Sequence, residues 1–182
     1  YMIYVFLANG FEEIEALTPV DVLRRAGLTV QTVGIGEKVV TSSHKVPVTA
    51  DITDDEMELN GDLQAVILPG GMPGTKNLDA SEAVTRALEF AKANDLFICA
   101  ICAAPSVLGH KGLLAGKEAI CFPGFESELT GATLSEKFVC RDGKVITGKG
   151  MGVATEFALE IASALAGDEA AEKVRAAIQF PR

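Results

Sequence analysis

The sequence predicts an α/β fold in which helices cover both faces of a mostly parallel sheet. Two observations support this fold class. Several segments, such as residues 2–8 and 65–68, are continuous apolar runs, which is typical of strands buried on both faces. Segments with apolar residues at helical spacing alternate with these runs, and such alternation favours parallel strands joined by helical crossovers.

The expected elements follow one another regularly along the chain. Strands are expected at residues 2–8, 29–34, 65–68, 96–101, 119–121, 138–141 and 145–147. Helices are expected at residues 12–26, 81–94, from 104 to about 109 or 112, 153–166 and 168–178. The segment 37–60 is less regular and carries short extended pieces around Val39 and Val46.

Length and charge limit the possible functions. The 182 residues suit one domain, expected over residues 2–182, with Tyr1 foreign to it. A net charge of −9 without a basic run argues against nucleic acid and anionic membranes as partners. The longest apolar stretch is too short to span a bilayer, and no segment resembles a secretory signal. We therefore expect a cytoplasmic protein whose four cysteines are free thiols.

Ligands of open parallel sheets bind beyond the carboxyl ends of the strands. Three loops follow strands that should be central, namely residues 9–13, 69–74 and 101–104. Each contains chemically useful groups, so we expect the functional site where these three loops meet.

Cys102 is the strongest candidate for a reactive residue. It lies in Ala100-Ile-Cys-Ala-Ala104, a pattern of small residues two positions either side of a nucleophile that is typical of a nucleophile elbow. Such a turn predicts a strained backbone at Cys102. The following helix N-terminus should lower the thiol pKa below its free value of about 8.5. The alternative is that Cys102 is a small core residue.

Cys99 and Cys102 also form a C-x-x-C pattern, but geometry argues against a disulfide. Cys99 should lie inside the strand, and three extended residues span about 10 Å, whereas a disulfide needs Cα atoms within about 7 Å. A zinc site is weakly supported because the other cysteines and the two histidines lack paired ligand spacing. We expect no metal.

The sequence leaves the partner of the thiol open. His110 should lie about two turns along the helix after the elbow and point away from the site, whereas His44 lies in the irregular segment and could border a pocket. Glu12, Glu13 and Glu15 cluster where a helix should begin, and one of them could turn inward beside the thiol, where burial would raise its pKa. Periodicity does not choose among the three.

Gly70 and Gly71 follow a buried strand and could let the backbone approach a ligand closely. The N–H groups of Gly71 and Ala103 could together form an oxyanion hole, although a plain tight turn explains the glycines equally well. The glycine-rich turn at residues 148–152 does not fit a phosphate-binding signature, so we expect no cofactor.

Taken together, these motifs resemble those of the ThiJ/PfpI superfamily, in particular its Parkinsonism-associated deglycase branch. The resemblance rests on Gly-Phe-Glu-Glu-Ile-Glu-Ala at residues 10–16, Pro-Val-Asp-Val-Leu-Arg-Arg-Ala-Gly at 19–27, Leu-Pro-Gly-Gly at 68–71, Ala-Ile-Cys-Ala-Ala-Pro at 100–105 and Thr-Glu-Phe-Ala-Leu at 155–159. These motifs cover nearly the whole chain in order.

The resemblance implies a flavodoxin-like three-layer sandwich and a homodimer formed through the first helix and the turn at residues 150–152. It selects Glu15 as the acid hydrogen-bonded to the Cys102 thiol. It places the oxyanion donors at Gly71 and Ala103, beside Gly70. It also implies a cysteine that is readily oxidised to a sulfinate.

Three positions depart from the family pattern. Protease-like relatives carry a histidine directly after the cysteine, where this chain has Ala103. The deglycase branch often has a histidine where this chain has Phe122, which makes the site more apolar. His44 stands where relatives have an arginine near the pocket rim.

Three functions follow as hypotheses. The first is a cofactor-independent glyoxalase or deglycase, in which Cys102 attacks a small 2-oxoaldehyde such as methylglyoxal and Glu15 moves the proton. The second is a redox sensor or chaperone that responds to oxidation of Cys102. The third, an intracellular peptidase or amidase, is the least favoured because no histidine adjoins the cysteine.

Overall fold

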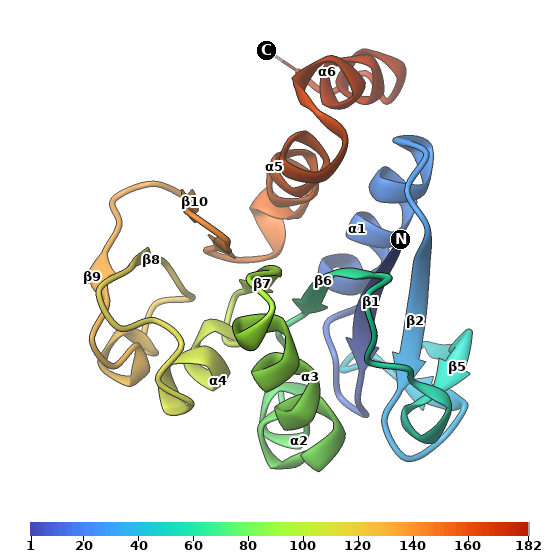
Figure 1. The fold of residues 1–182 in the computed structure, drawn as a ribbon, viewed down its shortest axis with the longest axis vertical. Coiled ribbons are helices and arrows are strands. Elements are labelled where there is room, and N and C mark those ends of the chain that lie inside the picture. Colours follow the sequence, from blue (N-terminus) through green and yellow to red (C-terminus); the bar gives the residue numbers. More distant parts are fainter. Residues whose placement is uncertain (182) are drawn as a thin grey trace.

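A seven-stranded sheet runs through the middle of the computed structural model, which describes residues 1–181 (Figure 1). The sheet order is β10-β11-β7-β6-β1-β2-β5. Every neighbouring pair is parallel except the edge pair of β10 with β11. The strands are β1 (Met2–Leu7), β2 (Val30–Gly34), β5 (Ile52–Thr53), β6 (Leu63–Leu68), β7 (Phe97–Ile101), β10 (Val139–Asp142) and β11 (Val145–Gly148).

The order of the five inner strands is the flavodoxin-like one. Numbered along the chain among themselves, β2-β1-β6-β7-β11 read 2-1-3-4-5. The strand order reverses between β1 and β6, which opens a crevice at their carboxyl ends. The predicted α/β fold with a mostly parallel sheet is therefore confirmed.

Helices lie on both faces of the sheet, and the last helix of the chain packs mainly against the helix before it (Figure 1). One core contains side chains of α1 (Glu13–Arg25), α5 (Ala154–Ala166) and α6 (Asp168–Ala177). The other contains side chains of α2 (Gly74–Ala80), α3 (Glu82–Ala93) and α4 (Pro105–His110).

Strand β1 contributes to both cores, which explains its continuous apolar sequence. Ile3, Val5 and Leu7 pack into the core with α1, whereas Tyr4 and Phe6 pack into the core with α3. Successive side chains of a strand point to opposite faces, so a strand covered on both sides needs apolar residues at every position.

The remaining elements are short. Two small sheets join β3 (Val39–Thr41) to β4 (Pro47–Thr49) and β8 (Glu118–Ala119) to β9 (Thr133–Leu134). Single 3₁₀ turns are η1 (Asp54–Glu56), η2 (Glu126–Glu128) and η3 (Met151–Val153). None of the helices within residues 1–181 combines the length and apolar composition needed to cross a membrane.

The structure departs from the predicted elements mainly at α2. This helix begins directly after the turn at residues 69–71, and its N-cap, Pro73, offers no side-chain hydrogen bond. Its sequence therefore carries turn signals and no helix-start signal, yet buried Leu78 anchors it in the core. The strand expected at residues 119–121 shortens to Glu118–Ala119.

Candidate active site

The three loops expected to form a site do meet at the carboxyl ends of β1, β6 and β7. The N–H of Glu12, at the start of α1, donates to the carbonyl of Gly70 after β6, at 2.9 Å. In return, the N–H of Gly70 donates to Oε1 of Glu15, at 3.0 Å. Cys102 follows β7 in the third loop. These bonds fix α1 against the glycine turn.

The backbone at Cys102 adopts the conformation predicted for an elbow. Its φ is 67°, in the left-handed region that costs a non-glycine residue about 1–2 kcal/mol. Its N–H donates to the carbonyl of Gly148 at 2.9 Å, and its carbonyl accepts from the N–H of Phe122 at 2.8 Å. Ala100 and Ala104, two positions either side, are completely buried. Surrounding contacts thus hold the strained turn in place.

Glycine is required at both positions of the turn after β6. A Cβ on Gly70 would lie 2.8 Å from Cβ of Cys102 and 2.8 Å from Oε1 of Glu15. Gly71 has a φ of +91°, and a Cβ there would lie 2.5 Å from the nitrogen of Glu12. These close approaches bring the N–H of Gly70 to the Glu15 carboxyl and the N–H of Gly71 to the Cys102 thiol.

Glu15 is the acid that turns inward, as the resemblance implied. The residue is completely buried, and its carboxyl lies within hydrogen-bonding range of the Cys102 thiol. Oε1 accepts the Gly70 N–H, whereas Oε2 has no hydrogen-bond partner of regular geometry among residues 1–181. Burial, reinforced by the charge of Glu12, raises the pKa of Glu15 to about 7.

The expected lowering of the Cys102 pKa is wrong. Burial, followed by the charge of Glu15 and its hydrogen bond, raises the pKa of Cys102 to about 12. The N–H groups of Ala103 and Gly71 bond to the sulfur and oppose this rise. The helix contributes little because α4 begins only at Pro105 and has six residues.

Glu15 and Cys102 therefore titrate as a pair. A charge on one group raises the pKa of the other, so once the first proton has left, the pair holds one negative charge and one proton well into the alkaline range. The N–H groups of Gly71 and Ala103 favour the charge on sulfur, whereas the N–H of Gly70 favours it on the carboxylate. The arrangement supplies an acid and a nucleophile together.

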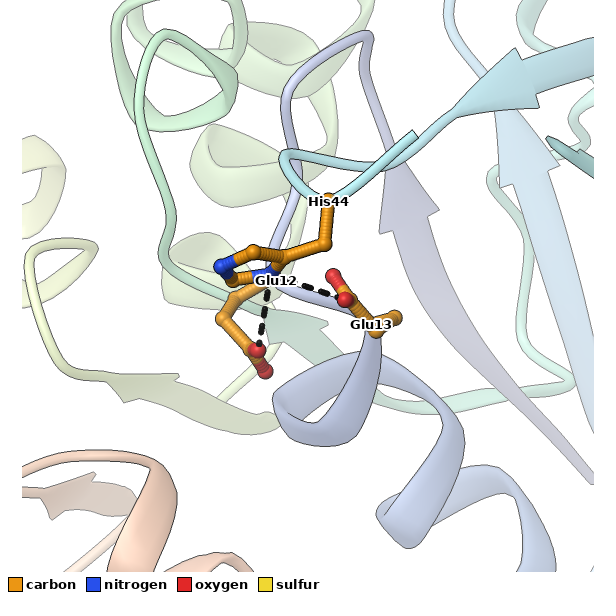
Figure 2. A group of neighbouring side chains, drawn as sticks. All are labelled: Glu12, Glu13 and His44. Carbon is orange, nitrogen blue, oxygen red and sulfur yellow. Dashed lines mark ion pairs between the residues drawn. The ribbon is translucent and has the colours of Figure 1, made fainter. Parts of the chain in front are cut away.

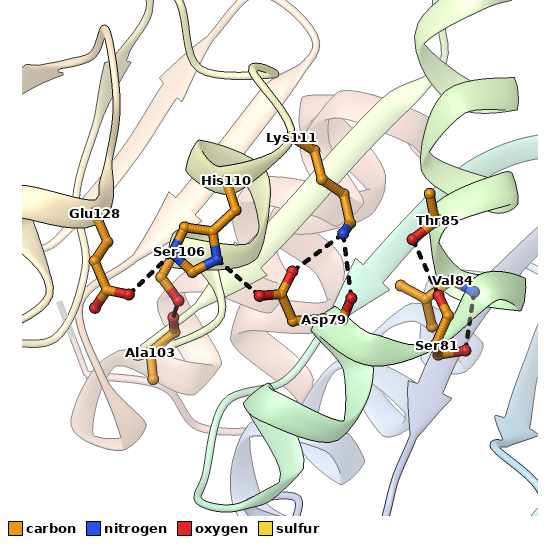
Figure 3. A network of polar contacts seen from close by, with 9 residues as sticks. All are labelled: Asp79, Ser81, Val84, Thr85, Ala103, Ser106, His110, Lys111 and Glu128. Atoms are coloured by element: carbon orange, nitrogen blue, oxygen red, sulfur yellow. Dashed lines mark hydrogen bonds and ion pairs between the residues drawn. The ribbon is translucent and has the colours of Figure 1, made fainter.

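Both histidines bind carboxylates and not the thiol. His44 approaches Glu13 at 2.8 Å and Glu12 at 3.8 Å, on the side of α1 near the site (Figure 2). His110 lies between Asp79 at 2.7 Å and Glu128 at 2.9 Å (Figure 3). Neither histidine is bonded to Cys102, and the expectation that a histidine-assisted peptidase lacks its base stays a prediction.

Phe122 is bonded to the elbow through its backbone. Its exposed ring lines an apolar hollow of about 460 Å³ together with Phe138 and Met151. Cys102 and Glu15 do not line this hollow, so the expectation that Phe122 makes their site more apolar stays a prediction.

Comparison with known proteins fits this geometry. The model of the DJ-1/PfpI family matches residues 2–164. The chain belongs to the DJ-1/PfpI family. The predicted resemblance is thereby confirmed, and the match spans every strand of the seven-stranded sheet.

Several DJ-1 relatives are similar over nearly the whole chain. Parkinson disease protein 7 homolog of Danio rerio is 38% identical, covering 94% of this chain and 93% of the relative. A glutathione-independent glyoxalase of Caenorhabditis elegans is 32% identical, covering 87% and 84%. The solved structure of oxidized Toxoplasma gondii DJ-1 has a TM-score of 0.95 at 35% identity, covering 100% and 99%.

Sequence reasoning missed the supporting role of Glu12 in this DJ-1/PfpI site. Its Oε2 accepts the N–H of Glu15 at 2.8 Å and so caps α1, while its own N–H donates to the carbonyl of Gly70. An acid three residues ahead of Glu15 at a helix start was a usable capping signal. The bonds from Cys102 to Gly148 and Phe122 had no such signal, because they join distant segments.

Proposed function

We propose that this protein is a glyoxalase-like enzyme that converts small 2-oxoaldehydes, such as methylglyoxal, into 2-hydroxy acids without glutathione. The observation that carries the proposal is the buried carboxyl of Glu15 beside the Cys102 sulfur, with two backbone N–H groups on that sulfur. The name of the Caenorhabditis elegans relative supports the same reaction class.

The reaction begins with attack of the Cys102 thiolate on the aldehyde carbon. A C–S bond forms, and the carbonyl electrons move to oxygen. The N–H groups of Gly71 and Ala103 stabilise the resulting oxyanion. Glu15 in its protonated form then donates its proton to this oxygen, which gives a hemithioacetal and a Glu15 carboxylate.

The second half moves a proton between neighbouring carbons. The Glu15 carboxylate removes the proton from the former aldehyde carbon and returns it to the adjacent carbon, while the hydroxyl proton of the hemithioacetal moves to the oxygen on that adjacent carbon. The product is a 2-hydroxy thioester. Water then adds to the thioester carbonyl and the C–S bond breaks. Methylglyoxal plus water gives lactate, and Cys102 and Glu15 again share one proton.

The test is lactate formation from methylglyoxal by purified protein without added glutathione. Cys102→Ala should abolish turnover because it removes the nucleophile. Glu15→Gln should lower kcat about 10²–10⁴-fold because it removes the proton carrier. Cys140→Ala, which changes a buried thiol in the edge strand, should retain activity. Equal rates for the parent and Cys102→Ala would exclude this function.

Oxidation of Cys102 in a redox sensor is the second candidate. Cys102 is half-buried, whereas Cys99, Cys121 and Cys140 are buried, so peroxide has its easiest access at Cys102. Two successive oxidations by peroxide would give a sulfinate, whose oxygens the Gly71 and Ala103 N–H groups and a protonated Glu15 can bind. Peptide mapping after mild peroxide should place two added oxygens on Cys102. Oxidation spread evenly over all four cysteines would contradict a sensor that responds selectively through Cys102.

We also propose that the protein forms a homodimer through α1. Ile14 and Leu17 are 45% and 38% exposed on the outer side of this helix, next to Thr155 of α5. The family resemblance implies an interface at the same helix. Exposed apolar side chains on one helix are well suited to cover one another across a two-fold axis.

A further inference from the structure

Three ligand-bearing side chains from two distant segments meet where α1 begins (Figure 2). Glu12 and Glu13 come from the start of the helix, and His44 comes from the turn between β3 and β4. One carboxylate oxygen of each glutamate and one ring nitrogen of His44 all lie within 4.8 Å of one another. The three side chains point toward a common centre.

The distances suit a single small cation. Zinc binds imidazole nitrogen and carboxylate oxygen at about 2.0–2.2 Å, which puts neighbouring ligand atoms of a tetrahedral site about 3.3–3.6 Å apart. Nδ1 of His44 lies 2.8 Å from Oε1 of Glu13 and 3.8 Å from Oε1 of Glu12. These two separations lie on either side of the required spacing, and the third, between the two carboxylates, is at most 4.8 Å, so modest side-chain movements would accommodate the ion.

The carboxylates of Glu12 and Glu13 share one imidazole, and each also has another hydrogen bond: Oε2 of Glu12 accepts the N–H of Glu15, and the Glu13 carboxyl bonds to backbone and to the Ser42 side chain. The side chains of Glu12 and Glu13 are only 12% and 15% exposed. Oε2 of Glu13 is buried without a hydrogen-bond partner of regular geometry in the described part of the chain. Paired, poorly hydrated carboxylates are costly unless a cation compensates them. The imidazole of His44, which is 70% exposed, is the basic group that pairs with both carboxylates.

We propose that Glu12, Glu13 and His44 bind one divalent transition-metal ion of the zinc class. An imidazole with two carboxylates matches the preference of zinc, whereas calcium takes six to eight oxygens. Three protein ligands leave a fourth position for water, and the exposure of His44 gives the ion access from solvent.

The ion would clamp the β3–β4 turn to α1. The turn already rests on this region, because the N–H of Ser43 donates to the carbonyl of Phe11 at 2.8 Å. Glu12 would link the metal to the Cys102 site. Its Oε2 accepts the N–H of Glu15, and its own N–H donates to the carbonyl of Gly70. The metal would therefore order the edge of the Cys102 site. This inference does not depend on which reaction Cys102 performs.

The experiment is titration of the Cys102→Ser protein with zinc chloride by calorimetry, because serine removes a competing thiol. We expect one zinc ion per chain. Adding His44→Asn should weaken zinc binding at least about tenfold. Adding His110→Asn is the matched control: His110 also lies between two carboxylates, but they contact opposite ring nitrogens and cannot share an ion with it. This control should retain the parent affinity.

Thermal unfolding supplies a second readout. Zinc should raise the Tm of the Cys102→Ser protein, and at the same zinc concentration it should raise the Tm of the His44→Asn form less, because the weaker site gains less free energy from binding. His44 is exposed, and ion pairs of exposed groups contribute little to stability, so its replacement should lower the Tm without zinc only slightly. The proposal is overturned if Cys102→Ser protein binds no zinc, if His44→Asn binds it equally well, or if His110→Asn weakens binding as much.

Discussion

At the scale of single residues, the site depends on how Glu15 and Cys102 share one buried space. Neither group is easily ionised there, and a charge on one opposes a charge on the other. The pair therefore keeps a proton through the neutral range, and the backbone N–H groups decide where the charge lies. This arrangement supplies a nucleophile and an acid without a histidine.

The buried carboxyl should make stability depend on pH. The folded pKa of Glu15, about 7, lies above its ordinary value of 4.5, so its stabilising contribution is complete below about pH 4.5 and is lost as pH rises through 7. Relative to Glu15→Gln, the parent should lose on the order of 2–3 kcal/mol between pH 4.5 and 8. Urea unfolding of both proteins across this range measures the difference. A constant difference would show that Glu15 titrates normally.

Gly70 should tolerate no side chain. In Gly70→Ala, the new methyl group would meet Cβ of Cys102 and Oε1 of Glu15 at 2.8 Å, so it must separate them. We expect at least about a hundredfold loss of methylglyoxal turnover, because small displacements of reacting groups are costly. Gly61→Ala is the control, since a Cβ there meets nothing within 4 Å. Equal activity of the two variants would refute the close approach.

At the scale of elements, a charged junction ties α4 to its neighbours (Figure 3). His110, the last residue of α4, contacts Asp79 of α2 through Nδ1 and Glu128 of η2 through Nε2. Lys111 adds a bond to Asp79 at 3.1 Å. Because both ring nitrogens face carboxylates, the imidazolium form fits best. The helix that follows the elbow is thus held at its far end.

This junction should weaken in alkali. Hydrogen bonding to Asp79 first, and then to Glu128, raises the pKa of His110 above 6.5. Its contribution is therefore complete below about pH 6.5 and is lost as pH rises through the folded pKa. The parent should exceed His110→Asn in stability by at most about 1 kcal/mol at pH 6, since the pair is partly exposed. The gap should close by pH 9 in urea unfolding, and a gap that persists would argue against the imidazolium.

At the scale of the whole molecule, α1 serves two surfaces. Its inner side brings Glu15 to the thiol, and its outer side exposes Ile14 and Leu17. Residues 14 and 15 are adjacent but point about 100° apart around the helix, so one element can line the site and carry an interface.

Replacing Leu17 should separate the proposed dimer. In Leu17→Arg, a charge would enter the apolar contact without a partner, so we expect monomers in sedimentation at micromolar concentration. Leu134→Arg is the control, because Leu134 is also an exposed leucine, at 48% against 38% for Leu17, but lies on β9. A parent protein that sediments as a monomer would contradict the dimer itself.

The sequence by itself determined the α/β alternation, the three loops of the site and the elbow at Cys102. Each of these follows from local rules: apolar runs mark buried strands, and only small residues fit beside a sharply turned nucleophile. The thiol pKa could not be predicted in this way. Burial and the charge of Glu15 come from other elements and outweigh the local effect of a six-residue helix.

Only the tertiary structure decided which acid meets the thiol. Glu12, Glu13 and Glu15 are nearly equivalent in sequence, but packing of α1 against the sheet buries Glu15 and leaves the other two facing His44. The glutamates and His44 are brought together by the return of the β3–β4 turn to the start of α1. Contacts between segments so far apart depend on how the chain packs, and spacing along the sequence does not encode them.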